Sequence, residues 1–324
     1  MGSDDHYRLE SPGRAGGEPL LVQARAVART QIDSAVRAVT DPGDDVAAAV
    51  HEARKCCKKL RGLARLIRPA IGDAYRPANQ AFRDAARALG PLRDAHAVAV
   101  SFDELVAGDE RVVLDLSTIG DELRRRADAA SASVTGDAPQ LAAAADLLRA
   151  GAVIVESWPE SRSESRPERR TSDVDGERAV LQAGVAGVVD RARRALAAAE
   201  VGADQEAWHD YRKRVKDTWY HLRLLEPSAP ALLGPLVASF DELSDVLGDE
   251  HDLAVLAELL DELERGRGDH GISAKTTVDA RFVIDGRREG LQRRARTIGT
   301  QLHAPTATTF AAFVTAAWAD PQGR

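Results

Sequence analysis

Two short stretches of this chain repeat one spacing of basic side chains. The pattern His-x-x-Arg-Lys-x-x-Lys occupies residues 51–58 and recurs at residues 209–216. Residues three and four apart lie on the same face of an α-helix, so each stretch would present a row of cations. Lysine and arginine bind phosphate oxygens, and arginine can contact two of them at once. This spacing predicts the binding of an extended anion.

Each of the two helices continues its row beyond the motif. The candidate binding residues are His51, Arg54, Lys55, Lys58, Arg61 and Arg65 on the first helix and His209, Arg212, Lys213, Lys216 and Arg223 on the second. Further candidates beside the first helix are Arg83, Arg87 and Arg93. Faces that meet only solvent usually mix charges, because like charges one turn apart repel by a few tenths of a kcal/mol. Two rows of like charge therefore favour an anionic ligand over a solvated face.

The residue types leave some roles open. His51 and His209 could contact phosphate, or could be buried at helix crossings and donate to a carbonyl or to a carboxylate such as Asp94 or Asp252. Arg93 could contact phosphate or pair with Asp94. The arginine-rich run 287–296 could form a further anion patch, although a solvated helix is the favoured interpretation.

The elements that would position these residues are helices. Of the 324 residues, 44% are hydrophobic and only 4% are aromatic, and alanine is abundant. Such a composition suits packed helices better than sheets. No apolar run reaches the roughly 18 residues of a membrane span. The two cysteines are adjacent, so no disulfide framework is expected and the compartment is predicted to be the cytoplasm. The net charge of −7 would disfavour a polyanion unless the positive charge is clustered.

Periodicity predicts an all-α chain of four parts. These are a flexible N-terminal tail at 1–18, a first helical half at 19–156, a mobile linker at 157–177 and a second helical half at 178–320. The helices predicted in the first half are 19–40, 44–70, 74–89, 91–107, 110–134 and 138–156. Those predicted in the second half are 178–200, 204–226, 229–247, 249–266, 276–303 and 305–319.

The two halves repeat each other. With a shift of 158 residues, segments 51–105 and 209–263 share 16 identities in 55 positions without a gap. Biased composition explains scattered alanine and leucine matches, but it does not align histidine, lysine, proline, phenylalanine and glycine in one register. The alignment predicts a duplicated unit, and therefore two pseudo-symmetric helical bundles.

These motifs resemble a known family. The pattern at 51–58 followed by Leu89-Gly90-x-x-Arg93-Asp94, and its copy ending in Leu247-Gly248-x-x-His251-Asp252, is similar to the signature of the conserved-histidine α-helical (CHAD) domains. The resemblance covers about residues 19–320.

The resemblance implies two helical bundles related by a pseudo-two-fold axis, with basic surfaces that bind inorganic polyphosphate and no established catalytic activity. CHAD domains often accompany a CYTH triphosphate-tunnel domain, whose ExExK signature is missing here, so the resemblance implies a stand-alone member. Some relatives associate with polyphosphate or polyhydroxyalkanoate granules. No cofactor, metal ligand or catalytic residue is predicted.

The differences between the two copies include four that bear on charge. His251 replaces the arginine of the pattern, Asp217 stands where the first copy has lysine, and Asp241 and Asp245 align with Arg83 and Arg87. The second surface should therefore be less positive than the first.

Three other functions remain as alternatives. His209-Asp210 and His251-Asp252 look like the paired ligands of metal-dependent HD phosphohydrolases, but the first copy lacks both pairs. A nucleic-acid-binding helical module is disfavoured, because few aromatic side chains lie near the rows to stack on bases. A scaffold that binds a granule surface through amphipathic helices would be compatible with polyphosphate binding.

Overall fold

A computed structural model describes residues 6–11, 18–90, 119–125, 129, 138–159, 170–202, 204–265 and 274–319. All the regular structure in these ranges is helical, and they contain no strand. The predicted all-α fold is confirmed. The predicted helix 91–107 and most of 110–134 lie outside the described residues, although 119–125 are helical.

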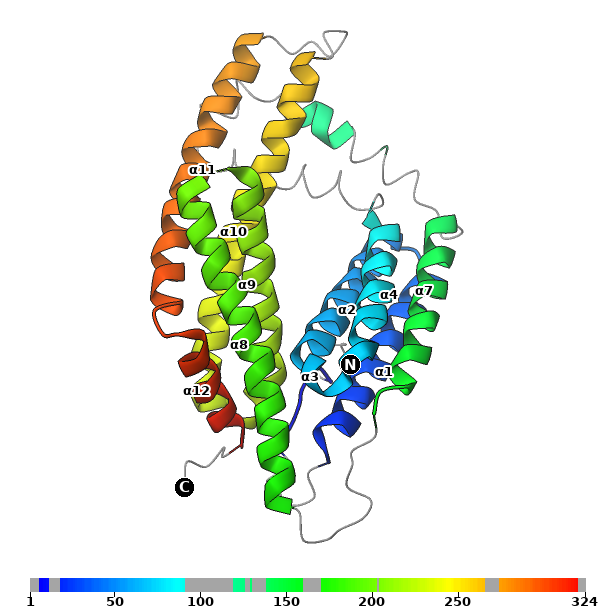
Figure 1. The fold of residues 1–324 in the computed structure, drawn as a ribbon. Coiled ribbons are helices and arrows are strands. Elements are labelled where there is room, and N and C mark those ends of the chain that lie inside the picture. The colour runs from blue at the N-terminus through cyan, green and yellow to red at the C-terminus, as the bar shows by residue number, and fades with distance from the viewer. Residues whose placement is uncertain are drawn as a thin grey trace.

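In the part of the first half that the structure describes, four main helices form a bundle (Figure 1). They are α1 (Leu20–Thr40), α2 (Val46–Leu66), α4 (Tyr75–Ala88) and α7 (Pro139–Glu156), with the short α3 (Arg68–Ile71) and the 3-10 turn η1 (Gly72–Ala74) between α2 and α4. Helix α1 packs against α2 and α7, and α4 packs against the same two helices. The Asp45 side chain caps α2 by accepting from the Ala48 amide.

The second half is built in a similar way from longer helices. They are α8 (Arg170–Gly202), α9 (Gln205–Leu225), α10 (Pro230–Arg265), α11 (Ala274–Leu302) and α12 (Ala307–Ala319), with the 3-10 turn η4 (Glu226–Ser228) after α9. Helix α9 packs between α8 and α10, as α2 packs between α1 and α4. Asp204 caps α9 through the Ala207 amide. This arrangement is compatible with the predicted pseudo-symmetry.

Some helix boundaries differ from the prediction. Helix α8 begins at Arg170, inside the segment 157–177 that was predicted to be a linker. Helix α10 runs unbroken through Gly248, where two helices were predicted. Gly248 corresponds to Gly90 in the repeat, where a break between two helices was also predicted. Gly90 is followed by proline, which disfavours helical geometry in the residue before it. Gly248 is followed by aspartate, so the helix can continue.

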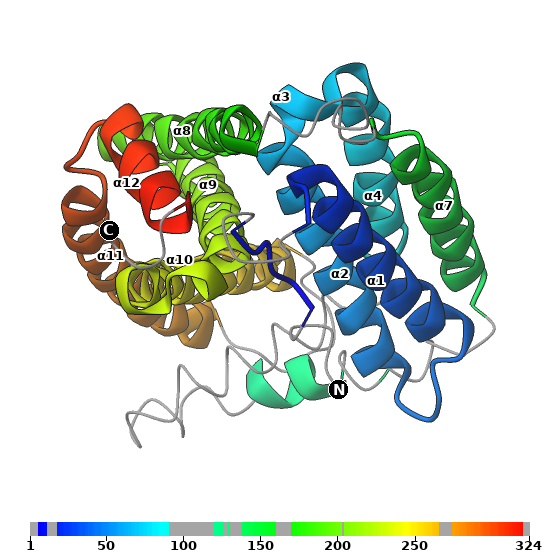
Figure 2. The same cartoon turned by 90° about the horizontal axis from the view of Figure 1, so that it is seen from below.

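The prediction of a flexible N-terminal tail is wrong for residues 6–11. Tyr7, Leu9 and Ser11 are buried. The Leu9 amide donates to the Leu224 carbonyl in the second half at 2.7 Å, and the Tyr7 hydroxyl donates to the Lys59 carbonyl in the first half at 3.1 Å. This N-terminal segment therefore touches both bundles, and Figure 2 shows it running between them in dark blue.

The two bundles meet mainly through α2, α8 and α9. Gly62 of α2 faces Tyr220 of α9 so closely that an added Cβ would lie 3.0 Å from the tyrosine Cβ. A Cβ on Gly184 of α8 would lie 2.1 Å from the carbonyl oxygen of Leu66. These glycines let the helix backbones approach closely, Gly62 between α2 and α9 and Gly184 between α8 and α2.

Within the described ranges, every helix is too short or too polar to cross a bilayer.

Candidate anion-binding site

Both basic rows lie on the two helices that join the bundles. The row on α2 (the first basic face: His51, Arg54, Lys55, Lys58, Arg61 and Arg65) and the row on α9 (the second basic face: His209, Arg212, Lys213, Lys216 and Arg223) belong to helices in mutual contact. The neighbouring side of α2 buries Val50, Cys57 and Leu60 in the core. Burial also raises the pKa of the Cys56 and Cys57 thiols to about 12, as expected for packing residues.

The N-terminal part of the first face is partly open to solvent. His51 is exposed, and Lys55 and Lys58 are half-buried. Arg54 lies against α4, where its guanidinium donates to the Ala86 carbonyl at 3.0 Å. Arg54 is therefore anchored by the fold, whereas each of the two lysines carries its charge on a flexible four-carbon chain.

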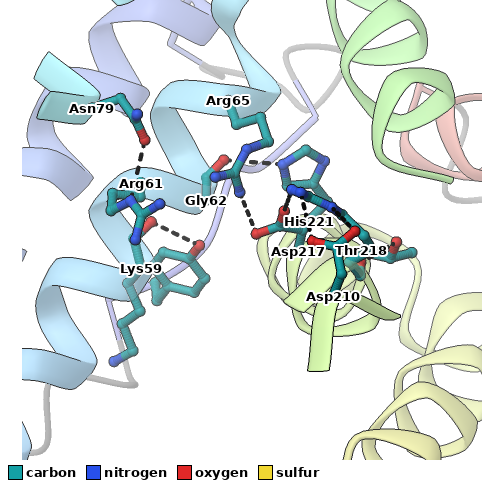
Figure 3. A network of polar contacts seen from close by, with 11 residues as sticks. Lys59, Arg61, Gly62, Arg65, Asn79, Asp210, Asp217, Thr218 and His221 are labelled. Carbon is teal, nitrogen blue, oxygen red and sulfur yellow. Dashed lines mark hydrogen bonds and ion pairs between the residues drawn. The ribbon is translucent and has the colours of Figure 1, made fainter. Parts of the chain in front are cut away.

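The C-terminal part of the first face enters the junction between the bundles (Figure 3). Arg61 donates through Nε to the Asn79 side chain of α4 at 3.1 Å. Arg65 pairs with Asp217 of α9, and the two side chains are only 11% and 16% exposed. Burial, followed by the positive charge of Arg65, lowers the pKa of the Arg61 guanidinium. This part of the face holds the halves together as well as concentrating charge.

The second face is more heavily balanced by acids. Lys213 lies 3.4 Å from Asp210, and the Arg223 guanidinium stacks over the Trp219 ring at 5.2 Å. Arg212 and Lys216 are half-buried. Burial and then Asp245 raise the pKa of Asp241, while Lys216 and Arg223 lower it, so these two cations lie within the field of Asp241. In contrast, Arg83 lies close enough to Arg61 to lower its pKa.

The two motif histidines differ in environment. His51 is exposed, so it is not buried at a helix crossing. His209 is half-buried and its ring lies 4.3 Å from the ring of His251. Burial, followed by nearby cations, lowers the pKa of both rings, that of His251 to about 4. The Nδ1 atoms of this ring pair have no hydrogen-bond partner in the described part of the chain.

The other arginine candidates are less central. Arg83 contacts Gln80 and Asp84, and Arg87 is 72% exposed at 3.8 Å from Asp84. Arg93 lies outside the described residues, as does Asp94. The run 287–296 is partly neutralised, since Arg288 pairs with the buried Glu250 and Arg294 pairs with Glu242.

The positions of the histidines and acids do not support the alternative function of a metal-dependent HD phosphohydrolase. The structure brings the rings of His209 and His251 together, but Asp210 is engaged by Arg214 at 2.9 Å. No group of three histidine, cysteine or acidic side chains able to hold a metal occurs in the ranges described.

Sequence reasoning missed three arginines at the junction. A pocket of about 430 Å³ there is lined by Arg61 and Arg65 and also by Arg68, Arg191 and Arg214. Arg68 follows the end of α2, Arg191 comes from the middle of α8 and Arg214 lies on α9. No spacing pattern links residues on three separate helices, so only the tertiary structure brings them together.

Comparison with known proteins agrees with this geometry. No curated protein matches the chain. The crystal structure of the CHAD domain from the plant Ricinus communis is similar in fold, with a TM-score of 0.60 at 15% sequence identity, covering 93% of this chain and 97% of that one. The family model of the CHAD domain matches residues 24–261. As both motifs lie inside that match, the chain belongs to the CHAD domain family.

Proposed function

We propose that this protein binds inorganic polyphosphate along the basic faces of α2 and α9. The observation that carries the proposal is that the duplicated motif lies on the two helices in contact across the bundles. An extended polyanion could therefore pass from one face to the other without leaving cationic surface. Lys55 and Lys58 on one side and Lys213 and Lys216 on the other are the principal contacts.

The proposed ligand is a polyanion without bases. Trp219 and Tyr220 contact each other edge to face with ring centroids 5.0 Å apart, and Arg223 covers the Trp219 ring. These aromatic side chains are thus engaged within the protein, whereas single-stranded nucleic acids are bound by aromatic rings that accept bases. This supports polyphosphate over nucleic acid.

The proposed role is binding in the cytoplasm and not catalysis. It would attach the protein to polyphosphate or polyhydroxyalkanoate granules. Attachment needs only the affinity of the two faces for a long chain. Long chains should bind more tightly than short ones, because neighbouring contacts on one chain raise the effective concentration.

The test is a titration with polyphosphate of defined lengths, with single-stranded DNA of matched charge as competitor. We expect the affinity for polyphosphate to fall steeply with rising salt, because lysine and arginine release condensed counterions when they bind. DNA should compete poorly, and the polyphosphate length should stay unchanged after prolonged incubation with the protein. Affinity independent of salt, or effective competition by DNA, would contradict the proposal.

A further inference from the structure

The arginine pocket at the junction of the bundles is a concentration of charge separate from the solvent-facing lysines. We define it by Arg61, Arg65, Arg68, Arg191 and Arg214. Its volume of about 430 Å³ is within the range of small-molecule sites. It lies where α2 and α3 of the first bundle meet α8 and α9 of the second.

The acids near the pocket leave most of this charge uncompensated. Asp217 pairs with Arg65 and lies 3.7 Å from Arg214, which also pairs with Asp210. Two carboxylates therefore form ion pairs with two of the five guanidiniums. Arg61 contacts a neutral amide, and Arg68 stacks over the Tyr75 ring at 4.9 Å.

Arg191 is the arginine of the pocket that most needs an anionic partner. It is half-buried, yet it makes no hydrogen bond or ion pair with any residue that the structure describes. Burial, followed by the charge of Arg65, lowers the pKa of its guanidinium. A partly desolvated cation beside other cations is costly unless an anion relieves it. The arrangement suits a ligand with several negative charges close together.

The pocket is not a product of the internal repeat. In the register of the repeat, Arg61, Arg68 and Tyr75 correspond to Trp219, Glu226 and Leu233, and Arg214 corresponds to Cys56. Arg65 alone is matched, by Arg223, so the equivalent place on the other side lacks most of the charges. Long-chain polyphosphate that binds along both basic faces would not require extra arginines on one side only.

We propose that the arginine pocket is a second binding site, for a compact ligand with adjacent phosphate groups. Planar guanidiniums from three directions match a di- or triphosphate, which presents many oxygens in a small volume. The ligand could be an inorganic oligophosphate or the triphosphate end of a nucleotide. The adjacent phosphates are the feature recognised in either case.

The test measures binding of tripolyphosphate and of ATP by calorimetry, with long-chain polyphosphate titrated in parallel. The test variant is Arg191→Gln, which removes one of the pocket's three charges without a carboxylate partner and breaks no hydrogen bond or ion pair with a described residue. The matched control is Arg194→Gln on the same helix, whose arginine is exposed and pairs with Asp190. A second test variant, Arg68→Gln, changes an exposed side chain at the pocket's edge.

We expect one tripolyphosphate per protein, and about a tenfold weaker affinity in Arg191→Gln with no change in Arg194→Gln. A double variant, Lys55→Gln with Lys58→Gln, should weaken long-chain binding and leave tripolyphosphate binding intact. Equal affinity for ATP would show that adjacent phosphates suffice, and weaker affinity would identify an inorganic ligand.

Tripolyphosphate affinity that is unchanged in both Arg191→Gln and Arg68→Gln would overturn the second site. Loss of tripolyphosphate binding in the lysine double variant would also overturn it, since the short ligand would then occupy the basic faces. If the wild-type protein bound tripolyphosphate but not long-chain polyphosphate, the result would contradict the proposed function alone. The two failures are therefore distinguishable.

Discussion

His221 is the residue that links protonation to the junction of the bundles. It lies on α9, fully buried, and its Nε2 is 3.0 Å from the carbonyl oxygen of Gly62 on α2. Burial, followed by the charge of Arg65, lowers the pKa of this imidazole well below its usual value. The ring is therefore neutral, and its Nε2–H donates to Gly62.

This environment predicts acid destabilisation. An unfolded histidine takes up a proton near pH 6.5, while buried His221 does not, so the free energy of unfolding should decrease as pH falls below about 6.5. One such group contributes a slope of at most about 1.4 kcal/mol per pH unit. His251 and His303, whose pKa values are lowered by burial to about 4, add to the same trend. Urea unfolding between pH 7 and 5 measures this slope.

The comparison variant is His221→Gln, whose amide can still donate to Gly62 but cannot titrate. Its free energy of unfolding should depend less on pH than that of the wild type. The difference in slope should equal the contribution of one titrating histidine. Identical slopes in the two proteins would show that His221 is not protonated differently in the folded and unfolded states.

At the scale of the helix, the two basic faces should contribute unequally to polyphosphate binding. Reversing Lys55 and Lys58 to glutamate should cost several-fold more affinity than reversing Lys213 and Lys216. The first pair stands on a helix reinforced by Arg83, whereas Asp241 offsets the second. Titration of both double variants, with circular dichroism melts to check folding, tests this. Equal losses would mean that the faces act as one symmetric site.

A second prediction at this scale concerns the contact of α8 with α2. Gly184→Ala would place a Cβ 2.1 Å from the Leu66 carbonyl oxygen, so the helices must separate. We expect the free energy of unfolding to decrease by about 2 to 3 kcal/mol, the usual range for overpacking.

The control for this change lies one turn away. The nearest atom to a Cβ at Gly187 is 3.7 Å distant, on the flexible Arg191 side chain. Gly187→Ala should be neutral or stabilising by up to about 1 kcal/mol through helix propensity. Equal destabilisation by both substitutions would show that the close approach at Gly184 is not the cause.

The helices could be predicted largely from the sequence, because periodicity and capping act locally. The prediction 204–226 differs from α9 by one residue at each end. The cationic rows were equally visible, since one helix carries each of them. Arg191 and Arg214 were not recognised, because they join Arg61 only after α8 and α9 dock on α2. The ion pair of Arg65 with Asp217 could not be predicted for the same reason. From the sequence, Asp217 was interpreted only as a residue that makes the second basic face less positive.

At the scale of the whole molecule, the two bundles share one continuous hydrophobic core. The N-terminal segment 6–11 is part of it, although polar residues and glycines around it suggested a tail. The Trp318 indole donates to the Leu9 carbonyl at 3.1 Å, which ties the segment to α12 near the other end of the chain. Distant partners of this kind leave no local pattern, so the sequence could not show that this segment is ordered.

The segment should therefore stabilise the assembled molecule. Leu9 is fully buried, and Leu9→Ala should lower the free energy of unfolding by about 2 to 4 kcal/mol, through lost burial and the cavity left behind. Tyr7→Phe removes only the hydrogen bond to Lys59 and should cost about 1 kcal/mol. Arg8→Ala is the control, because that side chain is 53% exposed and pairs, among the residues described, with the half-buried Glu10. Urea unfolding of the three variants decides the matter: if Leu9→Ala were as stable as Arg8→Ala, the segment would rest on the bundles without holding them together.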